Sequence, residues 1–241
     1  MPQLIIAVEG CLHGELDAVY ASIRDAERKT FRKVDLLLIC GDFESLVEES
    51  DMDCMAVPKK YRKMNEFRDY VRGIKRAHCP TIFVGGNHEA SNKLQALFYG
   101  GYVAPDIYFL GFAGSVKFKG LRIAGVSGIY NHRHYHLPHF EKPPYTPDQL
   151  RSIYHTRVQD IIRLSKLQGR VDIMISHDWP KDVWNYGDLN SLLREKPYFY
   201  DDMTSGNLGS PALAQLMGKI RPDYWFSAHL HTKFPAVIPW A

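Results

Sequence analysis

The sequence predicts an α/β fold in which at least one sheet mixes parallel and antiparallel strands. Three observations support this prediction: short runs rich in Val, Ile, Leu and Phe recur along the 241 residues, apolar residues at helical spacing separate some of these runs, and one stretch alternates as a hairpin does. A run that is apolar on both faces is typical of a buried central strand. The chain length favours one large domain over two small ones.

Each apolar run is expected to form a buried strand. The five runs are residues 4–8, 34–39, 81–84, 171–176 and 223–228. Between the first two runs, Leu16, Tyr20 and Ile23 recur at helical spacing and predict a helix. The same spacing predicts a longer helix from Pro147 to about Leu167.

Local signals mark a hairpin, a helix start and a long loop. Residues 115–126 alternate around Lys119-Gly120 and predict a hairpin. Ser210 followed by Pro211 predicts the N-cap and first turn of another helix. Residues 129–149 are irregular and contain four histidines and four prolines. A loop of this length inside a compact domain is usually functional.

Composition excludes several classes of protein. Lys and Arg number 30 against 27 Asp and Glu, so no global field marks a non-specific nucleic-acid binder, and any RNA contact must be local. The four cysteines have neither the density nor the spacing of a disulfide scaffold, which favours a reducing compartment. The opening run 4–8 is too short for a signal sequence or a membrane span. We therefore expect a soluble, intracellular protein without a membrane partner.

Metal-type ligands follow the end of each of the five predicted buried strands. In chain order they are Cys11 and His13, then Asp42, then Asn87 and His88, then His177, and finally His229 and His231. Taken singly, such a histidine is more often structural, and Gly-Asp or Gly-Asn is often a plain turn. Because strand ends meet at one edge of an α/β sheet, where sites are built, the set together predicts a metal centre.

The ligand types suit a pair of metal ions. Imidazole binds iron, zinc and manganese, a carboxylate can bridge two ions, and an Asn carbonyl supplies a neutral oxygen. Two ions about 3.5–4 Å apart stabilise both the attacking and the leaving oxygen of an in-line phosphoryl displacement. The pattern therefore predicts phosphoester hydrolysis.

The order GD, GNHE, SHD and HxH resembles the calcineurin-like metallophosphoesterases, whose fold is a two-sheet β-sandwich flanked by helices. That family usually opens with Asp-x-His, whereas this chain has Cys11-Leu12-His13. With this cysteine, the chain resembles the RNA lariat debranching enzymes. Shared motifs span nearly the whole chain and include CLHGELD, GDFES, CMAVPKKYR, GGNHEASN, YGGYVAPDIYFLG, HFEKPPY, RSIYHTR, SHDWP and YWFSAHLH.

The resemblance implies two ligand sets that share a bridging Asp42. One set is Cys11, His13, Asp42 and His231, and the other is Asp42, Asn87, His177 and His229. A coordinated thiolate supplies the negative charge that a carboxylate supplies in the wider family. Sulfur favours Fe²⁺ and Zn²⁺, with Mn²⁺ as the alternative. No histidine lies two residues after Cys40, Cys54 or Cys79, as His13 does after Cys11, so these three cysteines are interpreted as structural.

The resemblance further implies hydrolysis of the 2′,5′-phosphodiester bond at the branch point of excised intron lariat RNA. A metal-activated hydroxide would attack phosphorus, and His88 would protonate the leaving 2′-oxygen as the general acid. Glu89 is a candidate for orienting His88. The products would be a linear RNA with a free 2′-hydroxyl and a 5′-phosphate.

Residues 127–157 correspond to the lariat-recognition loop of that family. Aromatic rings there are candidates for stacking on bases, and polar groups for meeting base edges or phosphates. The candidate substrate-binding residues are Tyr130, Asn131, His139, Phe140, Tyr145 and Arg157, with Arg133 beside them. The alternative is a solvated His-rich loop or an adventitious metal tract.

Two rival functions remain open at this stage: a general metallophosphodiesterase that does not need the loop, and a non-catalytic scaffold with the same fold. Under the favoured interpretation the partner is branched RNA rather than DNA, the protein is a monomer, and its location is the nucleus. Residues 1–241 would form one debranching domain. The sequence stops ten residues after His231, so the family's carboxyl-terminal region is expected to be absent or truncated.

Overall fold

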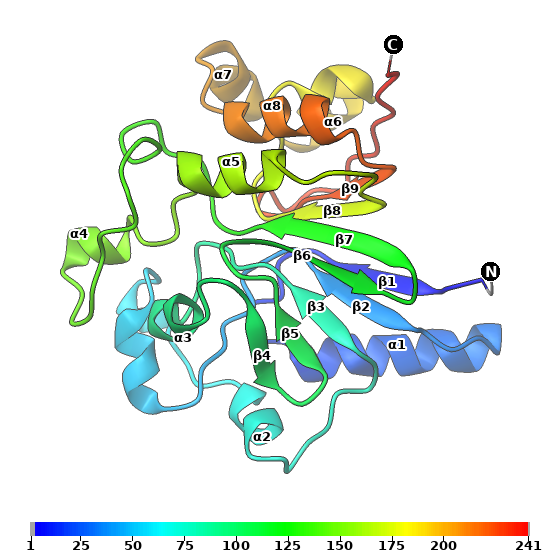
Figure 1. Ribbon diagram of the computed structural model, residues 1–241, viewed down its shortest axis with the longest axis vertical. Helices are drawn as coiled ribbons and strands as arrows, with labels where there is room; N and C mark the ends of the chain where they lie inside the picture. Colours follow the sequence, from blue (N-terminus) through cyan, green and yellow to red (C-terminus); the bar gives the residue numbers. More distant parts are fainter. Residues whose placement is uncertain (1–2, 241) are drawn as a thin grey trace.

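Two sheets pack face to face in the computed structural model, which describes residues 3–240 (Figure 1). The first sheet has the strand order β1-β2-β3-β5-β4, and the second has the order β6-β7-β8-β9. Pairing is parallel except in β4–β5 and β6–β7. The strands are β1 (Ile6–Glu9), β2 (Leu36–Ile39), β3 (Thr81–Phe83), β4 (Gly101–Ala104), β5 (Ile107–Phe109), β6 (Ala113–Phe118), β7 (Leu121–Val126), β8 (Ile173–Ser176) and β9 (Tyr224–Phe226). The predicted two-sheet sandwich is therefore confirmed.

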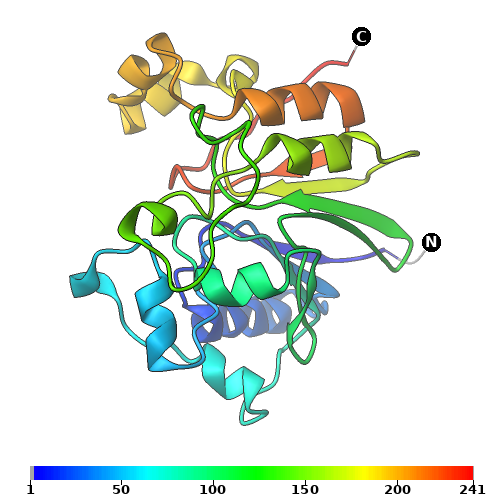
Figure 2. The same ribbon diagram turned by 60° about the vertical axis from the view of Figure 1, so that its left-hand side comes forward.

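Helices cover the outer faces of both sheets, as Figure 2 shows from a second side. Helix α1 (Leu16–Thr30) lies against the first sheet, whereas α5 (Val158–Ser165) and α8 (Pro211–Ile220) lie against the second. The shorter α-helices are α2 (Phe67–Val71), α3 (Ser91–Ala96), α4 (Pro147–Leu150), α6 (Leu189–Glu195) and α7 (Phe199–Thr204). Single 3₁₀ segments occupy Glu49–Cys54, Lys59–Tyr61 and Val183–Tyr186. No helix in residues 3–240 is long and apolar enough to cross a membrane.

The alternation of β2 explains why its run is apolar on both faces. Leu36 and Leu38 pack between the two sheets, against residues such as Ile173 of β8. Leu37 and Ile39 point the other way and pack beneath α1. Because side chains alternate across a strand, one apolar run serves two cores. The five strands predicted from such runs are present as β1, β2, β3, β8 and β9.

The predicted hairpin and the Ser210-Pro211 helix start are also present. Lys119 and Gly120 have φ values of 44° and 92° between β6 and β7, as the two central residues of a type I′ turn require. At the start of α8, the hydroxyl of Ser210 accepts a hydrogen bond of 3.2 Å from the backbone N–H of Leu213. Pro211 occupies the first turn of that helix, where a missing N–H costs nothing.

The single helix predicted over residues 147–167 is wrong, because the chain forms α4, then an extended turn, then α5. Hydrogen bonds to residues 127–129, at the start of the same irregular segment, hold this turn. The backbone N–H of Thr156 donates to the carbonyl of Ile129 at 3.0 Å, and its hydroxyl donates to the carbonyl of Ser127 at 3.0 Å. Arg157 is extended, with φ −107° and ψ 156°. Tertiary hydrogen bonds therefore override a helical pattern at this point.

Candidate metal centre

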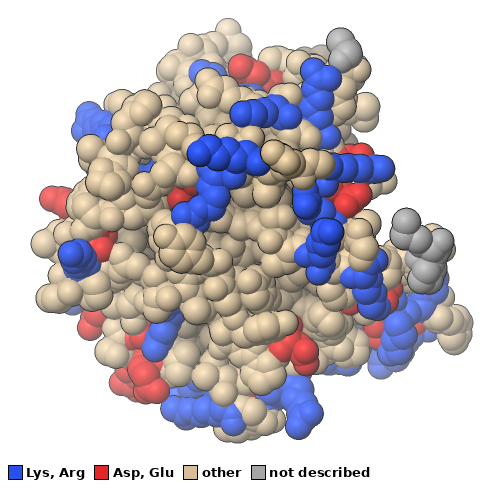
Figure 3. All heavy atoms as spheres, viewed as in Figure 1, with Lys and Arg blue, Asp and Glu red and all other residues tan. Residues whose placement is uncertain are grey.

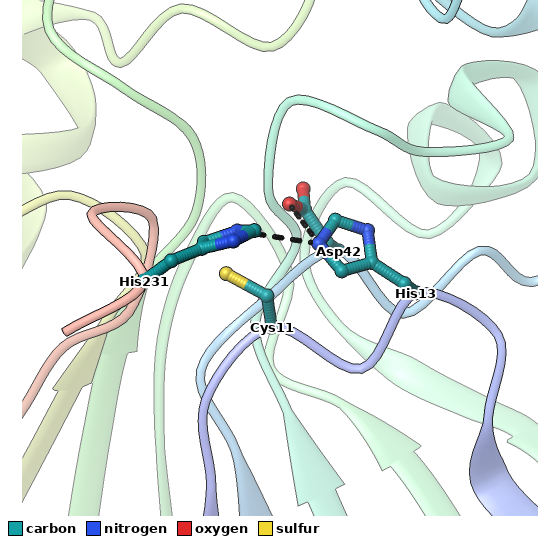
Figure 4. Close-up of side chains that lie close together, drawn as sticks. All are labelled: Cys11, His13, Asp42 and His231. Carbon is teal, nitrogen blue, oxygen red and sulfur yellow. Dashed lines mark hydrogen bonds and ion pairs between the residues drawn. The ribbon is translucent and has the colours of Figure 1, made fainter. Parts of the chain in front are cut away.

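Four potential metal ligands converge where strands from both sheets end. Cys11 and His13 follow β1, Asp42 follows β2, and His231 follows β9. One ligand atom from each of these residues lies within 4.8 Å of all the others (Figure 4). The Nε2 atoms of His13 and His231 are 3.3 Å apart, and Nε2 of His13 lies 3.8 Å from Oδ2 of Asp42. The sandwich thus brings together the first ligand set that the resemblance implies.

The backbone that presents these ligands is locally strained. His13, Asp42, His229 and His231 have φ values of 47°, 50°, 66° and 48°. The left-handed region costs a residue with a side chain about 1–3 kcal/mol when it is held there. Such conformations persist where the surrounding structure imposes them, and they cluster at functional sites. The backbone at these strand ends therefore positions the ligand side chains at a cost in stability.

Three residues of the second implied ligand set, Asp42, Asn87 and His177, meet beside the first set. Nε2 of His177 lies 3.0 Å from the side-chain oxygen of Asn87 and 3.4 Å from Oδ1 of Asp42. The ring of His229 lies 5.0 Å from the ring of His177, measured between centroids. The carbonyl of Cys40 lies 2.9 Å from Nδ1 of His177. When Nδ1 carries the proton, this contact leaves Nε2 unprotonated and aimed at Asp42, as a ligand nitrogen must be.

Two glycines allow the loops to approach Asp42 and His177 closely. A Cβ on Gly86 would lie 2.1 Å from Oδ1 of Asp42, and a Cβ on Gly41 would lie 2.2 Å from Nδ1 of His177. Gly41 also has a φ of 118°, which side-chain-bearing residues rarely adopt. The Gly-Asp and Gly-Gly-Asn-His signals of the sequence therefore reflect close packing of backbone against ligands.

The electrostatics of the site favour a cation. Burial raises the pKa of Asp42, but His177, His88 with its backbone N–H, and His13 together outweigh burial and hold that pKa below its usual value. Cys11 and Glu44 raise the pKa of His13 to about 10, because both groups favour a positive charge beside them. Burial lowers the pKa of His229 to about 4, so its imidazole is neutral, as metal binding requires. The thiol, carboxylate and imidazole donors therefore fit divalent metals.

Glu44 is an acid of this site that the sequence argument missed. Its Oε1 lies 3.7 Å from Nδ1 of His13, and Glu44, His13 and His88 form a second group of close potential ligands. At this distance the carboxylate attracts a positive charge on the ring but makes no hydrogen bond to it. The signal was present in the stretch GDFES, two residues after Asp42, but a single acid there cannot be told from a surface residue.

His88 stands at the open side of the cluster. Its side chain is 37% exposed, its Nδ1 lies 3.9 Å from Oδ2 of Asp42, and its ring centroid lies 5.3 Å from that of His13. Its backbone N–H donates to Oδ1 of Asp42 at 2.9 Å. His88 is therefore tied to the cluster through its backbone while its ring remains accessible to a substrate.

Glu89 does not orient His88 in this structure. It is buried, and its carboxylate accepts hydrogen bonds from three backbone N–H groups, those of Phe43 and Glu44 at 2.9 Å and of Gly86 at 2.8 Å. Burial raises its pKa to about 8. The carboxylate therefore ties the loop after β2 to the loop after β3, which fixes Asp42 relative to Asn87.

The other three cysteines have the character of structural thiols. Burial raises the pKa of Cys79 to about 11 and also raises the pKa values of Cys40 and Cys54. A thiol with a raised pKa is a poor metal ligand and a poor nucleophile at neutral pH. This agrees with the sequence-based interpretation, which set Cys11 apart from them.

Two of the predicted RNA-contacting residues lie inside the loop rather than on it. Arg157 is 0% exposed, and its guanidinium lies 2.5 Å from Oε1 of the buried Glu141. Nε2 of His139 lies 2.9 Å from Oδ2 of the buried Asp160. In this structure neither side chain is available to RNA. Both instead hold the segment 127–157 in shape, which the sequence pattern could not distinguish from surface contacts.

Of the remaining candidate residues some line an open cavity, whereas Tyr130 and Tyr145 do not. A cavity of about 690 Å³ is lined by Asn131, Phe140 and Arg133 among others. Phe140 is 43% exposed. Tyr130 packs against Tyr135 with ring centroids 5.3 Å apart, and the hydroxyl of Tyr145 donates to Gln95 at 2.6 Å. The loop thus presents one accessible aromatic ring and several polar groups around a hollow.

Comparison with known proteins gives a consistent picture. Residues 4–233 match the sequence model of a family described as calcineurin-like phosphoesterase. Over 233 residues, 97% of this chain, it is 54% identical to a lariat debranching enzyme of Arabidopsis thaliana, 53% to one of Danio rerio and 51% to one of Homo sapiens. The matched regions are 56%, 41% and 43% of those relatives. The chain therefore spans about half the length of the curated relatives it matches.

Proposed function

Because this chain belongs to the calcineurin-like phosphoesterase family, we propose that it is a metal-dependent RNA phosphodiesterase that hydrolyses the 2′,5′ bond at the branch point of lariat RNA. The observation that carries the proposal is the convergence of Cys11, His13, Asp42 and His231 within 4.8 Å. The names of the relatives support the branched substrate. Intron turnover in the nucleus is the role that this activity would serve.

Two groups of side chains would hold two divalent metals, as the family implies. Cys11, His13 and His231 would hold one, and Asn87, His177 and His229 the other, with Asp42 between them. Bound divalent metals lower the pKa of water and stabilise negative charge on phosphate oxygens. The thiolate favours Fe²⁺ and Zn²⁺, with Mn²⁺ as the alternative.

His88 is proposed as the general acid. A 2′-alkoxide is a poor leaving group unless it receives a proton as the bond to phosphorus breaks. The ring of His88 is exposed on one side and close to Asp42 on the other, so it can face a phosphate at the cluster. The hydrogen bond from the backbone N–H of His88 to Asp42 fixes where the proton is delivered.

The segment 127–157 is proposed to select the branch. Its cavity has a size typical of sites that enclose small molecules. Phe140 offers a ring for stacking, and Asn131 and Arg133 offer groups for base edges or phosphates. Arg157 and His139 would act indirectly, through the fold of the loop. We propose that the chain acts on RNA rather than DNA, and as a monomer.

A direct test uses a short branched RNA and a linear RNA of the same composition, with the chain loaded anaerobically with Fe²⁺ and Zn²⁺. The proposal expects cleavage at the 2′,5′ bond alone, and loss of that cleavage of about 100-fold or more in His88→Ala, the usual contribution of a general acid. Cleavage of both RNAs would show a general phosphodiesterase. Bound metal with no cleavage of either would support a non-catalytic scaffold.

A further inference from the structure

The edge of the sandwich opposite the metal centre carries an excess of positive charge. At this edge the parallel strands begin and the β6–β7 hairpin turns. The segments that form it are 25–35, 78–80, 105–106, 117–122, 166–172 and 219–223. Together they contain eleven Lys and Arg against six Asp and Glu, whereas the remainder of the chain has 19 against 21. Figure 3 shows Lys and Arg side chains gathered along the right-hand side of the molecule, where the hairpin turn lies in Figure 1.

Ion pairs join neighbouring segments of this edge. The Nζ of Lys119 in the hairpin turn lies 2.5 Å from Oδ1 of Asp35, at the start of β2. Arg170 pairs with Asp172, at the start of β8, and with Asp223, at the start of β9. Cationic ends of α1 and α8 are expected from the helix dipole alone. The dipole does not explain the three basic residues of the hairpin segment 117–122, which follow no helix.

An exposed aromatic ring lies within this basic surface. Phe31 follows the last residue of α1, has a φ of 54° and is 94% exposed. Lys29 and Arg32 flank it in the sequence. Lys29 pairs with Asp25, but Arg32 and, in the hairpin, Lys117 are exposed and take part in none of the ion pairs among residues 3–240. A fully exposed Phe in a left-handed conformation serves neither packing nor backbone geometry.

We propose that this edge is a docking surface for single-stranded RNA, with Phe31 as a stacking platform and Arg32 and Lys117 as phosphate contacts. An aromatic ring interleaved with cations is the chemistry that binds single strands without sequence preference. The inference rests on the proposed function, since the bound RNA would be a part of the lariat that lies far from its branch point. Helix α1 spans 15 residues between the two edges, about 22 Å, so only an RNA longer than the branch itself reaches both.

The test measures binding of a fluorescent single-stranded RNA of 20 or so nucleotides to the full chain across salt concentrations. Phe31→Ala with Arg32→Glu is compared with a matched control, Tyr198→Ala with Arg194→Glu, which removes an exposed ring and an exposed cation of the α6–α7 region. The edge variant should bind about tenfold more weakly, from the loss of one stacked base, and its salt slope should be lower by about 0.7, from the loss of one phosphate contact. The control should match the wild type.

Two further readouts separate the outcomes. Cleavage of a minimal branched RNA, with one nucleotide on each arm, should be equal in wild type and the edge variant, because this substrate does not reach the edge. If the wild type fails to cleave that substrate but the edge variant still loses RNA binding, the proposed function fails and the docking surface stands. Equal RNA binding by wild type and edge variant overturns the docking surface. So does edge-dependent binding of polyglutamate in place of RNA, which would assign the edge to an acidic protein.

Discussion

The sulfur of Cys11 lies 3.1 Å from the backbone nitrogen of His229, although 218 residues separate them. Cys11 follows the first strand of one sheet and His229 follows the last strand of the other. The N–H of His229 donates to this sulfur, which fixes the direction in which the Cys11 side chain points. The metal centre is thus assembled at the junction of the two sheets, and neither sheet alone carries it.

Replacing Cys11 tests the role of the thiolate. Loss of a residue that only hydrogen-bonds to a metal ligand costs about 10- to 100-fold in metal affinity. Loss of a direct ligand should cost at least as much, so Cys11→Ala should lower metal content sharply. Cys11→Asp restores a charged donor and should shift the preference from Fe²⁺ and Zn²⁺ towards Mn²⁺. Elemental analysis of the purified variants measures this. Unchanged metal content and preference in both would remove Cys11 from the ligand set.

Gly86→Ala should disrupt the centre without a change in any ligand. The new Cβ would lie 2.1 Å from Oδ1 of Asp42 and 2.5 Å from its backbone nitrogen, so Asp42 must move. We expect weaker metal binding and loss of phosphodiester hydrolysis. Gly218→Ala is the control, because a Cβ there meets nothing within 4 Å. It should stabilise α8 by up to about 1 kcal/mol. Full metal binding by Gly86→Ala would contradict the described close packing.

The buried pair of Arg157 and Glu141 should position the loop rather than contact RNA. Arg157→Met leaves the Glu141 carboxylate buried and unpaired, which typically costs about 3–5 kcal/mol. In the folded protein, KM for branched RNA should rise, whereas hydrolysis of bis(p-nitrophenyl) phosphate, which needs no branch recognition, should stay the same. Adding Glu141→Leu should recover much of the stability. If both substrates are affected equally, the pair serves the metal centre instead.

Stability in acid should depend on Glu27, which is far from the metal centre. Burial opposes its ionisation, but hydrogen bonds from Lys33 and from the backbone of Val34 outweigh burial and lower its pKa to about 2. A carboxylate whose pKa is lower in the folded state stabilises the fold above its unfolded pKa of about 4.5, and this contribution is lost as pH falls towards 2. Glu27→Gln should therefore lose about 2–3 kcal/mol at neutral pH, and its deficit should shrink below pH 4.5. Chemical denaturation across this pH range measures it, and a deficit independent of pH would contradict it.

The pattern of apolar residues in the sequence predicted part of the fold and of the candidate site. Double-faced apolar runs located the buried strands, and the polar residues after them marked the site, because strand ends share an edge. Periodicity could not show that residues 151–157 leave the helix, since hydrogen bonds of Thr156 to a distant segment decide that. Nor could it tell a buried Arg157 from an exposed one, because its partner Glu141 lies 16 residues away in an irregular loop.

Hydrolysis of a branched RNA in water enriched in ¹⁸O, followed by mass analysis of both products, tests the proposed reaction most directly. We expect a single ¹⁸O in a new 5′-phosphate on the released arm, a free 2′-hydroxyl without label, and an intact linear control RNA. Label at the 2′-oxygen, or cleavage of the linear RNA at a similar rate, would contradict attack on the 2′,5′-linked phosphorus at this metal centre.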